Sequence, residues 1–238
     1  MVCFLTSSTR TEDDLALNPA NGFVTALREA VGPSCRGLFI CSDPEEHERT
    51  EMYAASVWEN LSQAGIRVLE ASVLDGRNAD RAPALVAASD LIVLGGGHVP
   101  TQNRFFQKIG LKALLQNWSG VVIGISAGTM NSAEIVYAQP ELEGEAVRAD
   151  YERFLPGLGL TKVNILPHYQ AIRDEVLDGL RLFEDITFSD SMGRCFYAIP
   201  DGSYLYVDGN TTELRGEAWR IRDGSMEKLS GPGGVVRL

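Results

Sequence analysis

Short apolar runs rich in β-formers alternate with amphipathic stretches between residues 2 and 125, and this alternation strongly limits the possible folds. The apolar runs are Val2–Leu5, Gly37–Cys41, Ile66–Leu69, Leu91–Leu94 and Val121–Ile125. The stretches between them have helical character and are Phe23–Val31, Glu46–Ala64, Ala82–Ala88 and Gln102–Asn117. Regular alternation of this kind is the signature of a parallel sheet with helices on both faces. We therefore predict an α/β fold, a three-layer sandwich with a mainly parallel sheet.

The sequence changes in character after residue 126. Tyr137–Phe154 is rich in Glu, Gly and Pro without a strong apolar period, which predicts a surface excursion. Val163–Leu166 and Ile172–Phe183 predict a further strand and a further helix. From Cys195 onward, short apolar runs interrupted by Asp-Gly turns predict a small C-terminal antiparallel meander. Because nothing marks a domain boundary or a repeat, we expect residues 1–238 to form a single domain.

Charge and hydropathy exclude several classes of partner. The net charge of −11 argues against nucleic acid, because phosphate binding needs clustered Lys and Arg. No stretch approaches the ~20 apolar residues of a membrane helix, and the first residues lack a basic leader, so we expect no membrane partner. The four cysteines show no C-x-x-C spacing, which fits reduced thiols. These features favour a cytoplasmic protein, and they carry no information on its oligomeric state.

The strongest local motif is the G-x-S-x-G turn Gly124-Ile125-Ser126-Ala127-Gly128, which directly follows a buried apolar run. In such a turn the serine lies on a sharp corner between strand and helix, with its hydroxyl exposed near the positive end of the helix dipole. Glycines flank the corner because side chains there would clash. We interpret Ser126 as a nucleophile. The alternative is a turn whose serine only caps the helix.

A serine nucleophile needs a base, and the chain offers three histidines. His47 lies in a polar run at a helix start, which indicates solvated surface. His168 follows an apolar run, so it stands where a parallel strand ends, the edge at which doubly wound sheets place their sites. We predict His168 as the general base, with a buried structural histidine as the alternative.

The third histidine, His98, follows the cluster Gly95–Gly97. A dinucleotide-binding fingerprint would need a further glycine where Val99-Pro100 stands. Consecutive glycines can instead present backbone amides to an oxyanion, or form only a tight turn. His98 would then contact substrate or compete with His168 for the role of base.

Together these segments resemble the dipeptidase E (aspartyl dipeptidase) family of serine peptidases, a group more distantly related to cyanophycinase. The resemblance covers most of the chain and rests on Thr6-Ser7-Ser8, Gly95–Gly97, the Ser126 turn, Leu166-Pro167-His168-Tyr169 and Ile199-Pro200-Asp201-Gly202. It implies a flavodoxin-like or class I glutamine-amidotransferase-like domain that hydrolyses dipeptides or short peptides through an acyl-enzyme. It further implies a Ser126–His168–Asp201 triad, oxyanion donation by the amides of Gly96 and Ala127, and no metal or organic cofactor.

Two residues depart from the family pattern, since the dipeptidases usually carry Glu where Asp201 stands and Asn where His98 stands. Asp201 has a shorter reach to His168 by one methylene, and Asp190, Asp208 and Glu184 also follow His168 in the chain. A substrate with an N-terminal Asp would call for a cation, and the candidates are Arg104, Arg148, Arg153 and Arg173. Gly97, His98 and Arg173 are the expected substrate contacts, and the excursion 137–154 is expected to rim the mouth of the site.

Two other functions compete with a peptidase. An α/β-hydrolase esterase would run nucleophile, acid, histidine along the chain, but no histidine follows His168, so its acid would have to come from residues 134–152. A non-catalytic binding module of the amidotransferase-like fold would be free to lose its base or its acid, whereas all three residue types of a triad are present. The sequence therefore favours a serine peptidase.

Overall fold

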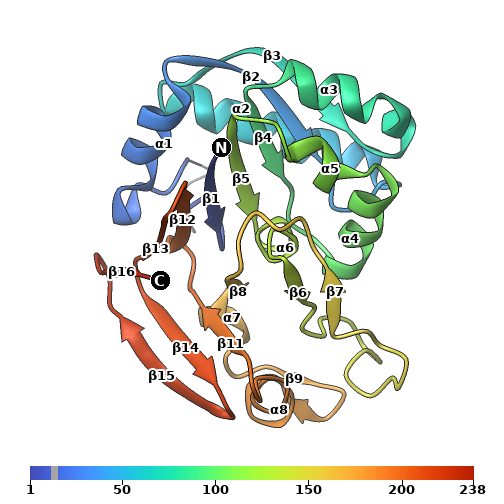
Figure 1. The fold of residues 1–238 in the computed structure, drawn as a ribbon, viewed down its shortest axis with the longest axis vertical. Coiled ribbons are helices and arrows are strands. Elements are labelled where there is room, and N and C mark those ends of the chain that lie inside the picture. Colours follow the sequence, from blue (N-terminus) through green and yellow to red (C-terminus); the bar gives the residue numbers. More distant parts are fainter. Residues whose placement is uncertain (12–15) are drawn as a thin grey trace.

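The computed structural model describes residues 1–11 and 16–238. Within these residues the largest sheet has eight strands in the order β16-β13-β12-β1-β5-β4-β2-β3 (Figure 1). Its parallel part consists of β1 (Val2–Thr6), β5 (Val121–Ile125), β4 (Leu91–Leu94), β2 (Ser34–Ile40) and β3 (Arg67–Leu74). The strands β12 (Tyr204–Asp208), β13 (Thr211–Arg215) and β16 (Val235–Arg237) extend it in antiparallel fashion.

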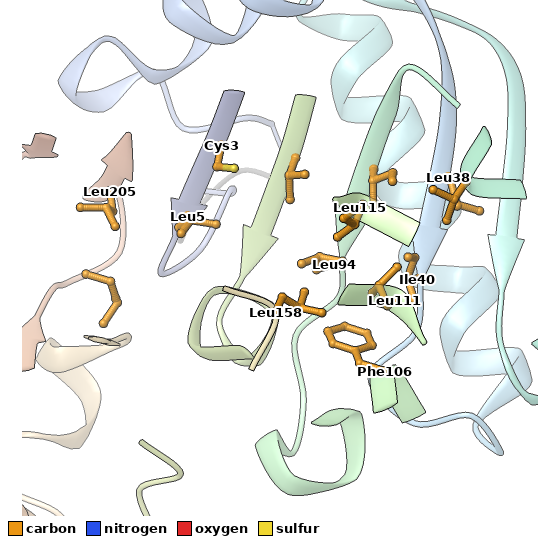
Figure 2. Packing of buried hydrophobic residues seen from close by; sticks show 14 of the residues in the cluster. Cys3, Leu5, Leu38, Ile40, Leu94, Phe106, Leu111, Leu115, Leu158 and Leu205 are labelled. Atoms are coloured by element: carbon orange, nitrogen blue, oxygen red, sulfur yellow. The ribbon is translucent and has the colours of Figure 1, made fainter. Parts of the chain in front are cut away.

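Helices cover both faces of this sheet, because side chains along each strand point alternately to opposite faces. On one face α1 (Phe23–Val31) and α2 (His47–Gln63) pack on a cluster that includes Phe4 and Ile123. On the other, α3 (Ala82–Ala88), α4 (Val99–Lys108) and α5 (Leu111–Leu115) pack on a cluster that includes Leu5 and Val122. Figure 2 shows Phe106, Leu111 and Leu115 packed against the sheet residues of that second cluster. The predicted three-layer α/β sandwich is confirmed.

A second sheet has the order β15-β14-β11-β8 and lies beyond the carboxyl ends of β1 and β5 (Figure 1). It consists of β8 (Asn164–Leu166), β11 (Cys195–Ala198), β14 (Ala218–Arg222) and β15 (Ser225–Ser230). β8 and β11 are parallel, and the other pairs are antiparallel. The predicted antiparallel strands of the C-terminal region are thus present, and they divide between two sheets.

Short elements complete the described structure. They are the 3₁₀ segments η1 (Ala20–Gly22) and η2 (Gly76–Arg81), the helices α6 (Ala127–Asn131), α7 (Tyr169–Ile172) and α8 (Phe188–Asp190), the π-helical η3 (Leu182–Thr187), and the paired strands β6 (Ile135–Tyr137) with β7 (Phe154–Pro156) and β9 (Val176–Leu177) with β10 (Leu180–Arg181).

The predicted helix Ile172–Phe183 is wrong. The chain there leaves α7 after one turn and forms the β9–β10 hairpin, which reverses at Asp178 and Gly179 with φ angles of 54° and 81°. Positive φ at both central residues is the geometry of a two-residue hairpin turn, for which Asp-Gly is a preferred sequence. The apolar spacing of this segment also fits a helical face, and that pattern concealed the turn.

Two further predictions need correction. The single helix expected over Gln102–Asn117 is divided into α4 and α5, because Gly110 adopts a left-handed conformation with a φ of 63°. The excursion 137–154 begins and ends in the β6–β7 pair and buries residues 137–140, so it is only partly a surface segment.

Among residues 1–11 and 16–238, no helix has the length and apolarity to cross a membrane. All four cysteines are free thiols. A single domain and a cytoplasmic location stay predictions.

Candidate active site

Ser126 occupies a strained corner between β5 and α6. Its φ and ψ of 51° and −110° are rare for a residue with a side chain. The corner is fixed to the neighbouring strand, because the Ser126 amide donates to the Thr6 carbonyl at 3.1 Å. A Cβ at Gly124 would lie 2.9 Å from Thr129 Oγ1, and one at Gly128 would lie 2.3 Å from a backbone carbonyl oxygen. Close packing therefore requires both glycines of the motif, and Ser126 is the residue that adopts the strained backbone conformation.

The glycine loop after β4 lies directly beside this corner. A Cβ on Gly96 would lie 3.3 Å from the Cβ of Ser126. Gly97 has a φ of 154°, and a Cβ there would lie 2.5 Å from Ser42 Oγ. Among the described residues, neither the Gly96 amide nor the Ala127 amide has a hydrogen-bond partner. Two free N–H groups on either side of a serine can receive an oxyanion.

His168 follows β8 and stands in a left-handed conformation with a φ of 57°. Its Nδ1 lies 2.9 Å from Oδ1 of Asp201. A carboxylate accepts hydrogen bonds, so Nδ1 carries the proton and Nε2 of the neutral ring is left as an acceptor. The structure therefore brings together the predicted base and the predicted acid.

Asp201 lies in the turn between β11 and β12, where Gly202 has a φ of 87°. Burial works to raise the pKa of the Asp201 carboxyl, but hydrogen bonds from His168 and from the Ser7 hydroxyl outweigh it and hold this pKa below the ordinary value. The Asp201 amide donates to Gln170 Oε1 at 3.1 Å. Asp201 is thus an anion at neutral pH, held from three directions.

The other acids that follow His168 have different neighbours. Asp190 accepts from the Tyr137 hydroxyl at 2.8 Å and lies 3.6 Å from Arg153. Asp208 ends β12 and is exposed, and Glu184 is exposed as well. Among these four acids, Asp201 is the one that forms a hydrogen bond with the His168 ring in the described structure. With the acid after the histidine, the order along the chain is serine, histidine, acid. An α/β-hydrolase esterase has the order serine, acid, histidine.

Ser126 and His168 lie on the wall of one cavity of about 280 Å³. The described residues that line it are Ser7, Ser8, Thr9, Arg10, Phe39, Arg49, Tyr53, Ser56, Val57, Gly96, Gly97, Ile125, Ser126 and His168. In the described part of the chain, the Ser126 hydroxyl makes no hydrogen bond with His168. Catalytic hydrogen bonds are often long without substrate and shorten in the complex.

Two arginines that the sequence prediction missed line this cavity. Arg10 follows Thr6-Ser7-Ser8 and donates to Ser56 Oγ at 3.4 Å. Arg49 lies in the first turns of α2, with its guanidinium 5.5 Å from the centre of the Tyr53 ring. A signal for both was present, since each follows the carboxyl end of a predicted strand. No carboxylate is among the described residues that line the cavity.

The arginines proposed from the sequence lie elsewhere. Arg104 and Arg148 line a separate cavity of about 770 Å³. Arg153 faces Asp190, and Arg173 is exposed and pairs with Asp174 at 2.8 Å. None of the four is among the described residues that line the Ser126 cavity.

His98 lines that larger cavity and uses both of its ring nitrogens. Nδ1 lies 2.8 Å from Thr101 Oγ1, and Nε2 lies 2.9 Å from Oε1 of the buried Glu145. With both nitrogens engaged, His98 is not placed to take a proton from Ser126. The excursion 137–154 also lies at the larger cavity. Its described residues that line a cavity, such as Leu142 and Glu145, line the one that contains His98 and not the one that contains Ser126.

His47 is half-buried rather than solvated, with Nδ1 3.5 Å from Asp75. Among the described residues, no group of three or more His, Cys, Asp or Glu side chains is arranged to hold a metal ion. The absence of a metal or cofactor stays a prediction.

Known peptidases resemble this chain in sequence or in fold. The model of Peptidase family S51 matches residues 4–215. A crystal structure of a peptidase from an acI-B1 actinobacterium has a TM-score of 0.65 and 17% sequence identity, covering 100% of this chain and 96% of that one. A putative peptidase E protein from Listeria monocytogenes EGD-e has a TM-score of 0.60 and 17% identity, covering 96% and 98%. None of the curated proteins matches the sequence. At these identities the two structures establish a shared fold.

Proposed function

Because this chain belongs to peptidase family S51 and is a serine-type peptidase, we propose that Ser126, His168 and Asp201 form its catalytic triad. The observation that carries the proposal is the hydrogen bond between His168 Nδ1 and Asp201 Oδ1, at 2.9 Å. This bond fixes the tautomer in which Nε2 has a free lone pair. The ring lies on the wall of the cavity that also contains Ser126.

The proposed reaction passes through an acyl-enzyme. Ser126 Oγ attacks the substrate carbonyl carbon while His168 Nε2 takes the hydroxyl proton, and Asp201 stabilises the resulting imidazolium. The carbonyl oxygen becomes an oxyanion that accepts hydrogen bonds from the amides of Gly96 and Ala127. His168 then returns the proton to the leaving amine as the C–N bond breaks. A water molecule hydrolyses the ester by the same steps and restores Ser126.

The proposed substrates are dipeptides or short peptides that carry an acidic group next to the scissile bond, an N-terminal Asp among them. Arg10 and Arg49 supply positive charge to the Ser126 cavity in a chain whose net charge is −11. No carboxylate among the described lining residues opposes that charge. A cavity of about 280 Å³ also suits a side chain or a small peptide better than a long chain.

A dipeptide library separates the parts of this proposal. We expect the wild-type enzyme to cleave a subset of dipeptides in which Asp-containing members are strongly represented, and we expect Ser126→Ala to cleave none of them. Cleavage by Ser126→Ala at the wild-type rate would refute the triad. Cleavage by the wild type that prefers basic or neutral residues would refute the substrate class and leave the triad in place.

A further inference from the structure

Ser7 is buried at the centre of the site and contacts two residues of the proposed triad. It directly follows β1 and is fully excluded from solvent. Its hydroxyl oxygen accepts the His168 backbone N–H at 2.7 Å. The same hydroxyl donates to Oδ1 of Asp201 at 2.5 Å. One side chain thus holds the backbone of the proposed base and the carboxylate of the proposed acid.

We propose that Ser7 is a positioning residue that sets the relative geometry of Ser126, His168 and Asp201. This inference rests on the proposed triad and goes beyond it, because Ser7 takes no proton and forms no bond to substrate in the mechanism above. In this proposal, the residue at the end of β1 fixes the position of the two sheets relative to each other near the reacting atoms.

The position of Ser7 directly after β1 explains how it can hold the three residues in place. β1 pairs in parallel with β5, and Thr6 is opposite Ile125, so Ser7 lies level with Ser126. The Thr6 hydroxyl donates to the Gly124 carbonyl at 2.8 Å, and the Thr129 hydroxyl donates to the Thr6 carbonyl at 2.8 Å. These bonds tie the backbone just before Ser7 to the turn that carries the nucleophile.

His168 and Asp201 belong to the other sheet, where they follow β8 and β11. The two hydrogen bonds of Ser7 therefore connect the sheet of the nucleophile to the sheet of the base and the acid. The bond to the His168 amide also restrains a left-handed backbone, at a φ of 57°, which is uncommon for a residue other than glycine.

Ser7 also fixes the orientation of the Asp201 carboxylate. Oδ1 of Asp201 accepts from the Ser7 hydroxyl and from His168 Nδ1, so its orientation is fixed by two donors instead of one. Without the hydroxyl, Oδ1 would lose one of these two donors and the carboxylate would be freer to rotate. Loss of the same hydroxyl would leave the His168 amide without its partner.

The test compares Ser7→Ala with Ser89→Ala as a matched control. Ser89 is also a buried serine whose hydroxyl donates a hydrogen bond, to the Val86 carbonyl at 2.9 Å, and it lies outside the Ser126 cavity. We expect Ser7→Ala to lower kcat by about tenfold to a hundredfold with KM within about threefold, since hydrogen bonds to charged groups have effects of this size. Ser89→Ala should keep the wild-type kcat. If Ser7→Ala does not fold, Ser7→Cys keeps most of the volume and supplies only a weak hydrogen-bonding group.

A proton NMR spectrum gives a second readout that does not depend on turnover. The His168 Nδ1–H proton should give a downfield signal that disappears in His168→Ala, and in the Ser7 variant it should broaden or move upfield. A Ser7 variant with the wild-type kcat, or with a reduced kcat and an unchanged Nδ1–H signal, overturns the positioning role. Absence of Ser126-dependent hydrolysis in the wild type would instead refute the proposed function, and the NMR comparison would still decide the role of Ser7.

Discussion

His168 and Asp201 lie 33 positions apart in the sequence, yet Nδ1 of the histidine is 2.9 Å from Oδ1 of the aspartate. The cause is the parallel pairing of β8 with β11, in which Leu166 is opposite Ala198. Because the two strands end at the same edge of the second sheet, His168 after β8 and Asp201 after β11 lie side by side. That edge meets the carboxyl end of β5, where Ser126 stands, so the two sheets supply the proposed triad between them.

The hydrogen bond between these residues predicts the effect of Asp201→Asn. An asparagine has nearly the same shape, but its amide can stabilise the imidazole tautomer that carries the proton on Nε2. We expect the variant to fold and to lose turnover by as much as about 10⁴-fold, the loss that the equivalent change causes in chymotrypsin-like proteases. Steady-state kinetics measures this loss, with Asp208→Asn as the control that keeps wild-type activity. A folded Asp201→Asn enzyme within about threefold of the wild type would show that another group orients His168.

The two arginines of the cavity predict a change in substrate preference. Arg10→Gln and Arg49→Gln should each raise KM for Asp-containing dipeptides by about tenfold to a hundredfold, because each removes a charged donor for the substrate carboxylate. The same variants should affect Asn-containing dipeptides much less. Arg173→Gln is the matched control, since Arg173 is exposed and outside the cavity. Equal losses on Asp and Asn substrates would mean that the arginines do not recognise the acidic group.

The lowered pKa of the Glu145 carboxyl predicts how the stability of the folded protein depends on pH. Burial works to raise the pKa of its carboxyl, but hydrogen bonds from the amides of Glu141 and Leu142 and from His98 lower it overall. The folded-state pKa is therefore below the unfolded-state value of ~4.3. The stabilisation from ionised Glu145 is fully present above that unfolded value and is lost as the pH falls through the folded-state pKa.

Glu145→Gln should accordingly lower the free energy of unfolding by about 1–3 kcal/mol near neutral pH. The difference from the wild type should shrink as the pH falls below ~4. Urea unfolding at several pH values measures it, with the exposed neighbour Glu143→Gln as control. A difference between Glu145→Gln and the wild type that stays constant across this range would contradict the explanation.

The sequence was most informative where local patterns decide the structure. The strands up to residue 125, the Ser126 turn and the strand before His168 follow from apolar runs and glycine chemistry, and the three-layer fold follows from their alternation. The helix predicted over Ile172–Phe183 is wrong because the apolar spacing fits a helix, whereas Asp178-Gly179 turns the segment into a hairpin. Competing local signals of this kind are settled by packing.

Contacts between distant segments were harder to predict. The hydrogen bond between His98 and Glu145 joins residues 47 positions apart, and nothing in their spacing indicates that His98 lies outside the Ser126 cavity. The role of Ser7 depends on where β1 lies relative to both sheets, which the motif Thr6-Ser7-Ser8 does not reveal. Arg10 and Arg49 both follow predicted strands, but which cations near strand ends reach Ser126 depends on the order of the strands in the sheet.

The central claim is that Ser126 is a nucleophile activated by His168, and labelling with a fluorophosphonate tests it most directly. Only a serine hydroxyl beside a base and oxyanion donors reacts rapidly with such a probe. We expect peptide mass spectrometry to find a single modified residue, Ser126, with labelling abolished in Ser126→Ala and strongly slowed in His168→Ala. Modification of a different serine, or no modification of an enzyme that hydrolyses dipeptides, would contradict the claim.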